Sequence, residues 1–186
     1  MRTLIALFAG CLISSFAFAA VPEEAWREAR IRPQDPRLVE LLRAGVARSA
    51  TLRDMVNRIE AGNVIVYVSL SPALKSSIAG KLTWMTRAGA YRYVKATINT
   101  DQSADQMIAT LAHELQHALE VSADDTVGDQ RSLLELYKRI GRPSLSGASA
   151  GWETTAAQET GLQVRRELIA STAVAAVMRA SGNTQL

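Results

Sequence analysis

The chain of 186 residues has a single cysteine, Cys11. This residue lies inside the N-terminal stretch MRTLIALFAGCLISSFAFAAVP, which we expect to be removed from the mature protein. The mature chain would then contain no cysteine, which excludes a framework of disulfide bonds. Its stability must therefore come from side-chain packing or from a bound metal ion.

The N-terminal stretch has the parts of a secretory signal peptide. One arginine precedes an apolar run over residues 4–18, and Ala17-Phe18-Ala19 is a small-residue cleavage pattern. The run is shorter than the roughly 20 apolar residues that a membrane-spanning helix needs. We therefore predict a signal peptide over residues 1–19 and a periplasmic or secreted mature chain. As an alternative, Phe8-Ala9-Gly10-Cys11 resembles a lipoprotein cleavage box, which would anchor the protein through a lipid on Cys11.

The sequence also lacks a basic block with interleaved aromatic residues. Its formal net charge is +3, and its arginines are spread among acidic residues along helical stretches. Such stretches are typical of solvated helix faces, so we predict no nucleic-acid partner. There are no internal repeats and no linker of biased composition. Residues 20–186 are therefore predicted to form a single domain.

The first half of this domain is predicted to contain a helical stretch followed by a small sheet. Apolar residues at three- and four-residue spacing predict one long helix or a broken pair over residues 37–62. Three later segments are rich in β-branched and aromatic residues, which favours strands. We expect these segments to form an antiparallel sheet: Val64 to Leu70, Lys81 to Thr86 and Ala90 to Ile98.

The second half is predicted to be helical. Ser103-Ala104-Asp105-Gln106 is typical of a capping box, so a helix should begin there and extend to about Val121. A short helix is expected from Gln130 to Ile140, and a last helix from Trp152 to about Arg179. The sequence therefore predicts an α+β fold with an N-terminal helix, a small antiparallel sheet and C-terminal helices.

Both histidines of the chain lie on the helix that begins near Ser103. His113 and His117 are four residues apart, so their side chains project from the same helix face and can reach one metal ion. Glu114 follows the first histidine and can accept a proton from a metal-bound water. The alternative is a coincidental pair of helix histidines. Apolar neighbours would bury this helix, however, and an unpaired ionisable pair is costly in a core.

With His113, Glu114 and His117 the chain resembles the zincin metallopeptidases, which are defined by the pattern H-E-x-x-H. The resemblance implies a zincin-like fold and one zinc ion, with both histidines as ligands and Glu114 as the general base. It also implies an exported peptidase that acts on a peptide or protein substrate. In that fold an edge strand of the sheet pairs with the extended substrate, and we expect this strand to be residues 64–70 or 90–98.

A catalytic zinc site needs a third protein ligand. No histidine remains, and Ala123 stands where the metzincin branch has its third histidine, so we expect a carboxylate. Glu120 lies roughly 10 Å along the helix axis from His113, which is too far for the two side chains to converge on one ion. We therefore expect Glu120 to act outside the metal.

Glu153 is the preferred third ligand. Ala156 and Ala157 follow it three and four residues later, so the last helix could pack closely against the helix that bears the histidines. The set His113, His117 and Glu153 resembles the gluzincin arrangement. The carboxylates of three other residues stay open as alternatives: Asp124, Asp125 and Glu159.

The sequence leaves the substrate and one catalytic role undecided. Four residues are candidates for stabilising a developing oxyanion: Tyr137, Tyr91, Tyr93 and Arg142. Two other functions also fit the pattern. One is a zinc-dependent amidase that acts on the cell wall or another non-protein substrate, and the other is a zinc-stabilised scaffold without catalytic activity.

Overall fold

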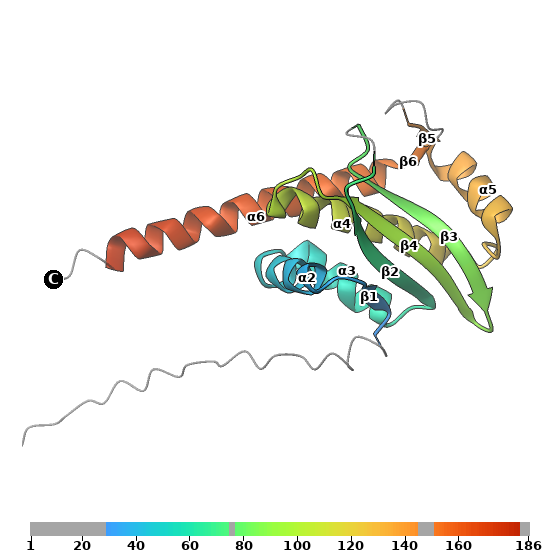
Figure 1. Cartoon of the computed structure of the whole chain (residues 1–186), viewed down its shortest axis with the longest axis horizontal. Coiled ribbons are helices and arrows are strands. Elements are labelled where there is room, and N and C mark those ends of the chain that lie inside the picture. The colour runs from blue at the N-terminus through green and yellow to red at the C-terminus, as the bar shows by residue number, and fades with distance from the viewer. Residues whose placement is uncertain (1–28, 75–76, 145–150, 183–186) are drawn as a thin grey trace, which may run out of the picture.

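A computed structural model describes residues 29–74, 77–144 and 151–182 (Figure 1). The predicted signal peptide over residues 1–19 and Cys11 lie outside these residues. The described part contains five helices and two small sheets, so the fold is α+β. Within these ranges, no helix has the length and apolar character that a membrane crossing requires.

Two helices form the first helical stretch, α2 (Pro36–Arg48) and α3 (Ala50–Glu60). The stretch predicted over residues 37–62 is therefore a broken pair. Ser49 separates the two helices in an extended conformation, and its hydroxyl accepts a hydrogen bond from the backbone N–H of Leu52 at 3.0 Å. This is the favoured role of serine at a helix N-terminus, because it satisfies a donor that has no partner within the helix.

The break at Ser49 is fixed by a carboxylate from the last helix, α6 (Thr155–Gly182). Glu167 accepts hydrogen bonds from the hydroxyls of Ser49 and Thr51 at 2.5 and 2.6 Å. Burial alone would raise the pKa of Glu167, but these hydrogen bonds outweigh it and lower the pKa to about 2. The ionised carboxylate therefore connects α6 to the start of α3.

This depressed pKa predicts a loss of stability in acid. The contribution of Glu167 is fully present above its ordinary pKa of 4.5 and is lost as the pH falls through about 2. Because the side chain is partly exposed, we expect Glu167→Gln to lower the free energy of unfolding at neutral pH by about 1–2 kcal/mol. Urea unfolding at a series of pH values measures this. Glu159→Gln is the control, and equal acid dependence of the wild type and Glu167→Gln would contradict the assignment.

The main sheet has the strand order β1-β2-β4-β3. Its strands are β1 (Ile31–Pro33), β2 (Val64–Ser71), β3 (Gly80–Ala88) and β4 (Tyr91–Asn99). The β1–β2 and β2–β4 pairs are parallel, and only β3–β4 is antiparallel. The predicted antiparallel sheet is therefore wrong, since the sheet is mixed.

The mixed order follows from the way in which the β3–β4 hairpin docks. Gly89 turns the hairpin with a φ of 57°, a conformation that glycine adopts at little cost. β4 is largely buried whereas β3 is mostly exposed, so β4 takes the inner place beside β2. The expectation that residues 64–70 or 90–98 form the edge is wrong for the same reason. The edges are β1 and β3.

Helix α4 (Ala104–Ala123) packs across the sheet and lies behind it in Figure 1. The predicted capping box is confirmed, because Ser103 and Gln106 exchange both of its hydrogen bonds. At the other end, the buried Arg92 of β4 donates to the carbonyl oxygens of Val121 at 2.8 Å and Asp124 at 2.6 Å. These bonds add to the longer backbone hydrogen bonds that the same carbonyl oxygens accept from Asp124 and Val127, and they fix the end of α4 against the sheet.

The C-terminal part begins with α5 (Gln130–Ile140), as predicted. A second, two-stranded sheet follows, formed by β5 (Arg142–Pro143) and β6 (Trp152–Glu153). The last helix was expected to begin at Trp152, but it begins at Thr155. Thr154 explains the difference, since its hydroxyl accepts a hydrogen bond from the backbone N–H of Ala157 at 3.1 Å and so caps α6.

Candidate metal centre

Three residues predicted as metal ligands come together in the fold. His113 and His117 project from α4, and Glu153 approaches from β6. One ligand atom from each residue lies within 4.8 Å of the others. The two imidazole rings meet edge to face with centroids 4.9 Å apart, and Nε2 of His113 lies 3.2 Å from Oε2 of Glu153. This group could hold one metal ion.

A close approach of α6 to α4 positions Glu153. A Cβ atom added at Gly161 would lie 3.3 Å from the carbonyl oxygen of Ala109 and 3.4 Å from Cβ of His113, so little more than a glycine fits there. Ala157, one turn earlier, is fully buried, whereas Ala156 is exposed. Of the two alanines predicted to allow close packing against α4, only Ala157 is buried. The prediction did not include Gly161, which lies four residues after Ala157 on the same helix face.

The side chains of Glu120 and Thr154 position the imidazole of His117. Nδ1 of His117 lies 2.8 Å from Oε2 of Glu120, and the hydroxyl of Thr154 donates to Oε1 of Glu120 at 2.6 Å. These contacts leave Nε2 of His117 as the nitrogen that can bind a metal, an arrangement common among histidine ligands. Glu120 does not belong to the group of candidate ligands, in agreement with the expectation from the helix rise. Sequence reasoning did not find Thr154, whose only local signal is its place before a helix.

Glu114 is buried beside the three ligand candidates but does not belong to their group. Its side chain is 3% exposed, and burial raises its pKa despite the opposing influence of His117 and His113. A raised pKa makes a carboxylate a stronger base. The position of Glu114 and the direction of its pKa shift both suit a general base.

Two buried oxygen atoms around this site, Glu114 Oε2 and the Tyr137 hydroxyl, have no hydrogen-bond partner, and Glu153 Oε2 has only the contact of 3.2 Å with Nε2 of His113. Tyr137 comes from α5, and its ring packs edge to face on His117 with centroids 5.3 Å apart. Each unpaired buried polar group costs about 1–3 kcal/mol. Their concentration at one place therefore fits a site whose contacts are completed by a bound ion and its water ligand.

Burial and neighbouring groups shift the pKa values of three side chains at the site: His113, Glu153 and Tyr137. Burial lowers the pKa of His113, but the hydrogen bond with Glu153 and the charge of Glu114 outweigh it, so the pKa is raised. Burial raises the pKa of Glu153, but the hydrogen bond with His113 outweighs it, so this pKa is lowered. Burial and nearby carboxylates raise the pKa of Tyr137 well above its ordinary value, which keeps its hydroxyl protonated.

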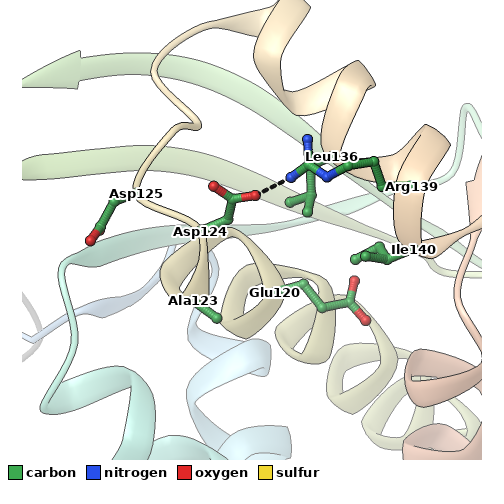
Figure 2. A pocket seen from close by; sticks show the side chains of 7 residues that line it. All are labelled: Glu120, Ala123, Asp124, Asp125, Leu136, Arg139 and Ile140. Atoms are coloured by element: carbon green, nitrogen blue, oxygen red, sulfur yellow. Dashed lines mark hydrogen bonds and ion pairs between the residues drawn. The ribbon is translucent and has the colours of Figure 1, made fainter.

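The alternative ligands Asp124 and Asp125 lie elsewhere. Figure 2 shows them beside a pocket of about 370 Å³ between the end of α4 and helix α5. Asp124 forms an ion pair with Arg139, and Asp125 is 94% exposed and points away from the pocket centre. Neither carboxylate belongs to the group that includes the histidines, and Glu159 is exposed on α6 and also stands apart.

Among the four candidates for an oxyanion donor, only Tyr137 contacts a histidine of the site. The hydroxyl of Tyr91 accepts a hydrogen bond from Arg30, and the guanidinium of Arg142 donates to Gln158. Tyr93 lies on β4, on the face of the sheet opposite to Val94 and the helices. The choice of Tyr137 could not be made from the sequence, because it depends on how α5 folds back toward α4.

Comparison with protein-family models, with curated proteins and with solved structures finds no match for this chain.

The third ligand can be tested by substitution. If this group holds a divalent metal ion such as zinc, Glu153→Ala should weaken its binding more than about a hundredfold, because even residues that only support a ligand change metal affinity 10- to 100-fold. Competition with a chromophoric chelator measures this affinity. Glu159→Ala and Asp124→Ala are the matched controls and should bind the ion like the wild type. Loss of the ion from Asp124→Ala but not from Glu153→Ala would show that the candidate ligand has been assigned to the wrong helix end.

Proposed function

We propose that this protein is an exported zinc-dependent metallopeptidase. The observation that carries the proposal is the convergence of His113, His117 and Glu153 beside the buried Glu114. Two imidazoles and one carboxylate are a ligand set that suits zinc and leaves a position open. Bound zinc would act as a Lewis acid and would lower the pKa of a water molecule.

The side chains of the site have separate tasks in the proposed reaction. Glu114 takes a proton from the attacking water and later delivers it to the leaving amine. Glu120 holds the imidazole of His117 in the orientation and tautomer that a ligand needs. The Tyr137 hydroxyl, buried and protonated, donates a hydrogen bond to the negative charge that develops on the scissile carbonyl oxygen.

The edge strand β3 supports a polypeptide as the substrate. It begins at Gly80, where an added Cβ would lie 2.7 Å from Oε1 of Glu114, so the strand starts directly beside the proposed base. The backbone N–H of Asn99 donates to the carbonyl oxygen of Ala79 at 2.8 Å. Since hydrogen-bonded pairs alternate along an antiparallel ladder, the backbone groups of Gly80 and Leu82 point outward. An extended peptide can add to this edge by main-chain hydrogen bonds.

A zinc-dependent amidase or a zinc-stabilised scaffold without catalytic activity would use the same site. One experiment distinguishes these two alternatives from the proposed peptidase. Zinc-loaded protein is incubated with a mixture of unfolded peptides and, separately, with cell-wall fragments. The proposed peptidase gives new amino termini within the peptides. Release of peptide from the cell-wall fragments alone would indicate an amidase, and bound zinc without either product would indicate a scaffold.

The contact between β3 and Glu114 gives a prediction that does not involve a metal ligand. Gly80→Ala should keep zinc but lower turnover about tenfold or more, because the new methyl group would displace the carboxylate of Glu114 and the side chain of Thr110. Steady-state kinetics and zinc analysis check the two parts. Gly128→Ala is the matched control, since its Cβ would meet only the side chain of Arg87, at 3.4 Å. Unchanged turnover in Gly80→Ala would show that the base lies elsewhere.

A further inference from the structure

The sheet is built from a part of the chain that has no acidic residue. The sequence contains 18 aspartates and glutamates, but none lies between Ala61 and Thr100. This stretch includes β2, β3 and β4, and the short edge strand β1 has no acidic residue either. The basic residues of the sheet therefore have no carboxylate among their neighbours on the strands.

The pairing of the strands places several of these basic residues on one face. Along β4, Arg92, Val94 and Ala96 are buried, whereas Tyr93 and Lys95 alternate with them and are partly exposed. The register aligns Lys95 with three residues of the neighbouring strands. The resulting row crosses all four strands on the side away from α4: Arg32, Tyr67, Lys95 and Thr83. Lys81, two residues before Thr83 on β3, lies on the same side, and we call this surface the open face.

The guanidinium groups of Arg32, on the open face, and of Arg30, two residues before it, contact tyrosines and no carboxylate; the carboxylate of Glu60 accepts from the backbone N–H of Arg30, at 2.9 and 3.1 Å. The guanidinium of Arg32 lies 5.6 Å from the ring centroid of Tyr67 and donates to its hydroxyl at 3.1 Å. The guanidinium of Arg30 lies 4.3 Å from the ring centroid of Tyr91. In the part of the chain that the structure describes, none of the ion pairs involves Arg30, Arg32 or the two lysines.

We propose that the open face binds an acidic segment of a polypeptide. Among the described residues, Arg32 donates through Nε to the carbonyl oxygen of Ala29 at 2.9 Å and through Nη1 to the hydroxyl of Tyr67, so its Nη2 remains available to a carboxylate. Arg30 donates through Nη2 to the hydroxyl of Tyr91 and keeps Nε and Nη1 available. The guanidinium of Arg30 also covers a face of the Tyr91 ring, which a nucleobase would need for stacking. The open face also adjoins β3, where a substrate would add under the function proposed above. A peptide paired there places alternate side chains next to Lys81 and Thr83, so acidic residues at those positions are preferred.

Binding to the open face can be measured apart from catalysis. The probe is a fluorescein-labelled peptide of alternating glutamate and serine, and its counterpart has glutamine in place of glutamate. Fluorescence anisotropy with zinc-loaded protein (residues 20–186) gives the affinity at low and at physiological salt. The test variant combines Arg32→Gln with Lys95→Gln. The control removes the same charge from exposed positions of α6, by combining Arg165→Gln with Arg166→Gln.

We expect the glutamate peptide to bind more tightly than the glutamine peptide and to lose affinity with added salt. The test variant should weaken binding about tenfold, because each exposed ion pair contributes a few-fold. The control variant should change it less than about twofold. Equal binding of the two peptides, or an equal loss in the control variant, would overturn the proposal. Tighter binding of single-stranded DNA would also overturn it, in favour of a general polyanion surface.

The cleavage of the same peptides distinguishes this proposal from the proposed function. Selective binding of the glutamate peptide without any hydrolysis would leave the open face in place and remove the peptidase. Hydrolysis of both peptides at the same rate, with no effect of the test variant, would leave the peptidase and remove the open face as a determinant of its substrates.

Discussion

His113→Ala and His117→Ala should each leave the protein without stoichiometric zinc. Each substitution removes one imidazole from the proposed set of three protein ligands, and the remaining pair cannot complete a tetrahedral set. Because the proposed zinc ion would bind the folded chain, its loss should also lower stability. At a free zinc concentration about 1,000 times the dissociation constant, bound metal contributes about 4 kcal/mol.

Metal analysis after gel filtration measures the zinc content, and thermal unfolding with and without a chelator measures the stability. The wild type should lose stability when the chelator is added, whereas the two histidine variants should not respond to it. Asp125→Asn is the control, because this residue is 94% exposed and lies outside the group. One equivalent of zinc retained by either histidine variant would show that the metal lies elsewhere.

Glu114→Gln should keep zinc and the native fold but lose turnover by at least about a hundredfold. Glutamine has the shape of glutamate but cannot accept the proton from the attacking water, so the proposed general base is lost while the proposed ligands stay in place. The KM for a peptide substrate should change little, because the loss falls on the chemical step. Glu159→Gln, an exposed change on α6, is the control. A Glu114→Gln variant with full activity would eliminate the proposed mechanism.

The helices and strands of this protein could be predicted where local patterns determine them. The capping box at Ser103, the β-branched run from Val64 and the turn at Gly89 each depend on neighbouring residues, and each is present in the structure. The order of the strands could not be predicted in the same way. It depends on β4 docking beside β2, a contact between segments that the turn and β3 separate in the sequence.

In the candidate site too, some residues could be predicted from local sequence patterns, whereas others depend on contacts between distant segments. His113, Glu114 and the supporting role of Glu120 follow from the geometry of one helix, so the sequence could indicate them. Glu153 was predicted to lie at the N-terminus of the last helix, but it lies on β6. The difference arises because Thr154 follows that strand and caps α6. Contributions that depend on α5 and α6 folding back on α4, such as those of Tyr137 and Gly161, had no local signal.

The most direct test of the central claim is a crystal structure of the zinc-loaded protein with an anomalous difference map at the zinc absorption edge. The claim predicts one peak bonded to Nε2 of His113, Nε2 of His117 and a carboxylate oxygen of Glu153, at about 2.0–2.2 Å. Glu114 should lie beside the peak without binding it. A peak with Glu114 among its ligands, or a peak away from these histidines, would contradict the account.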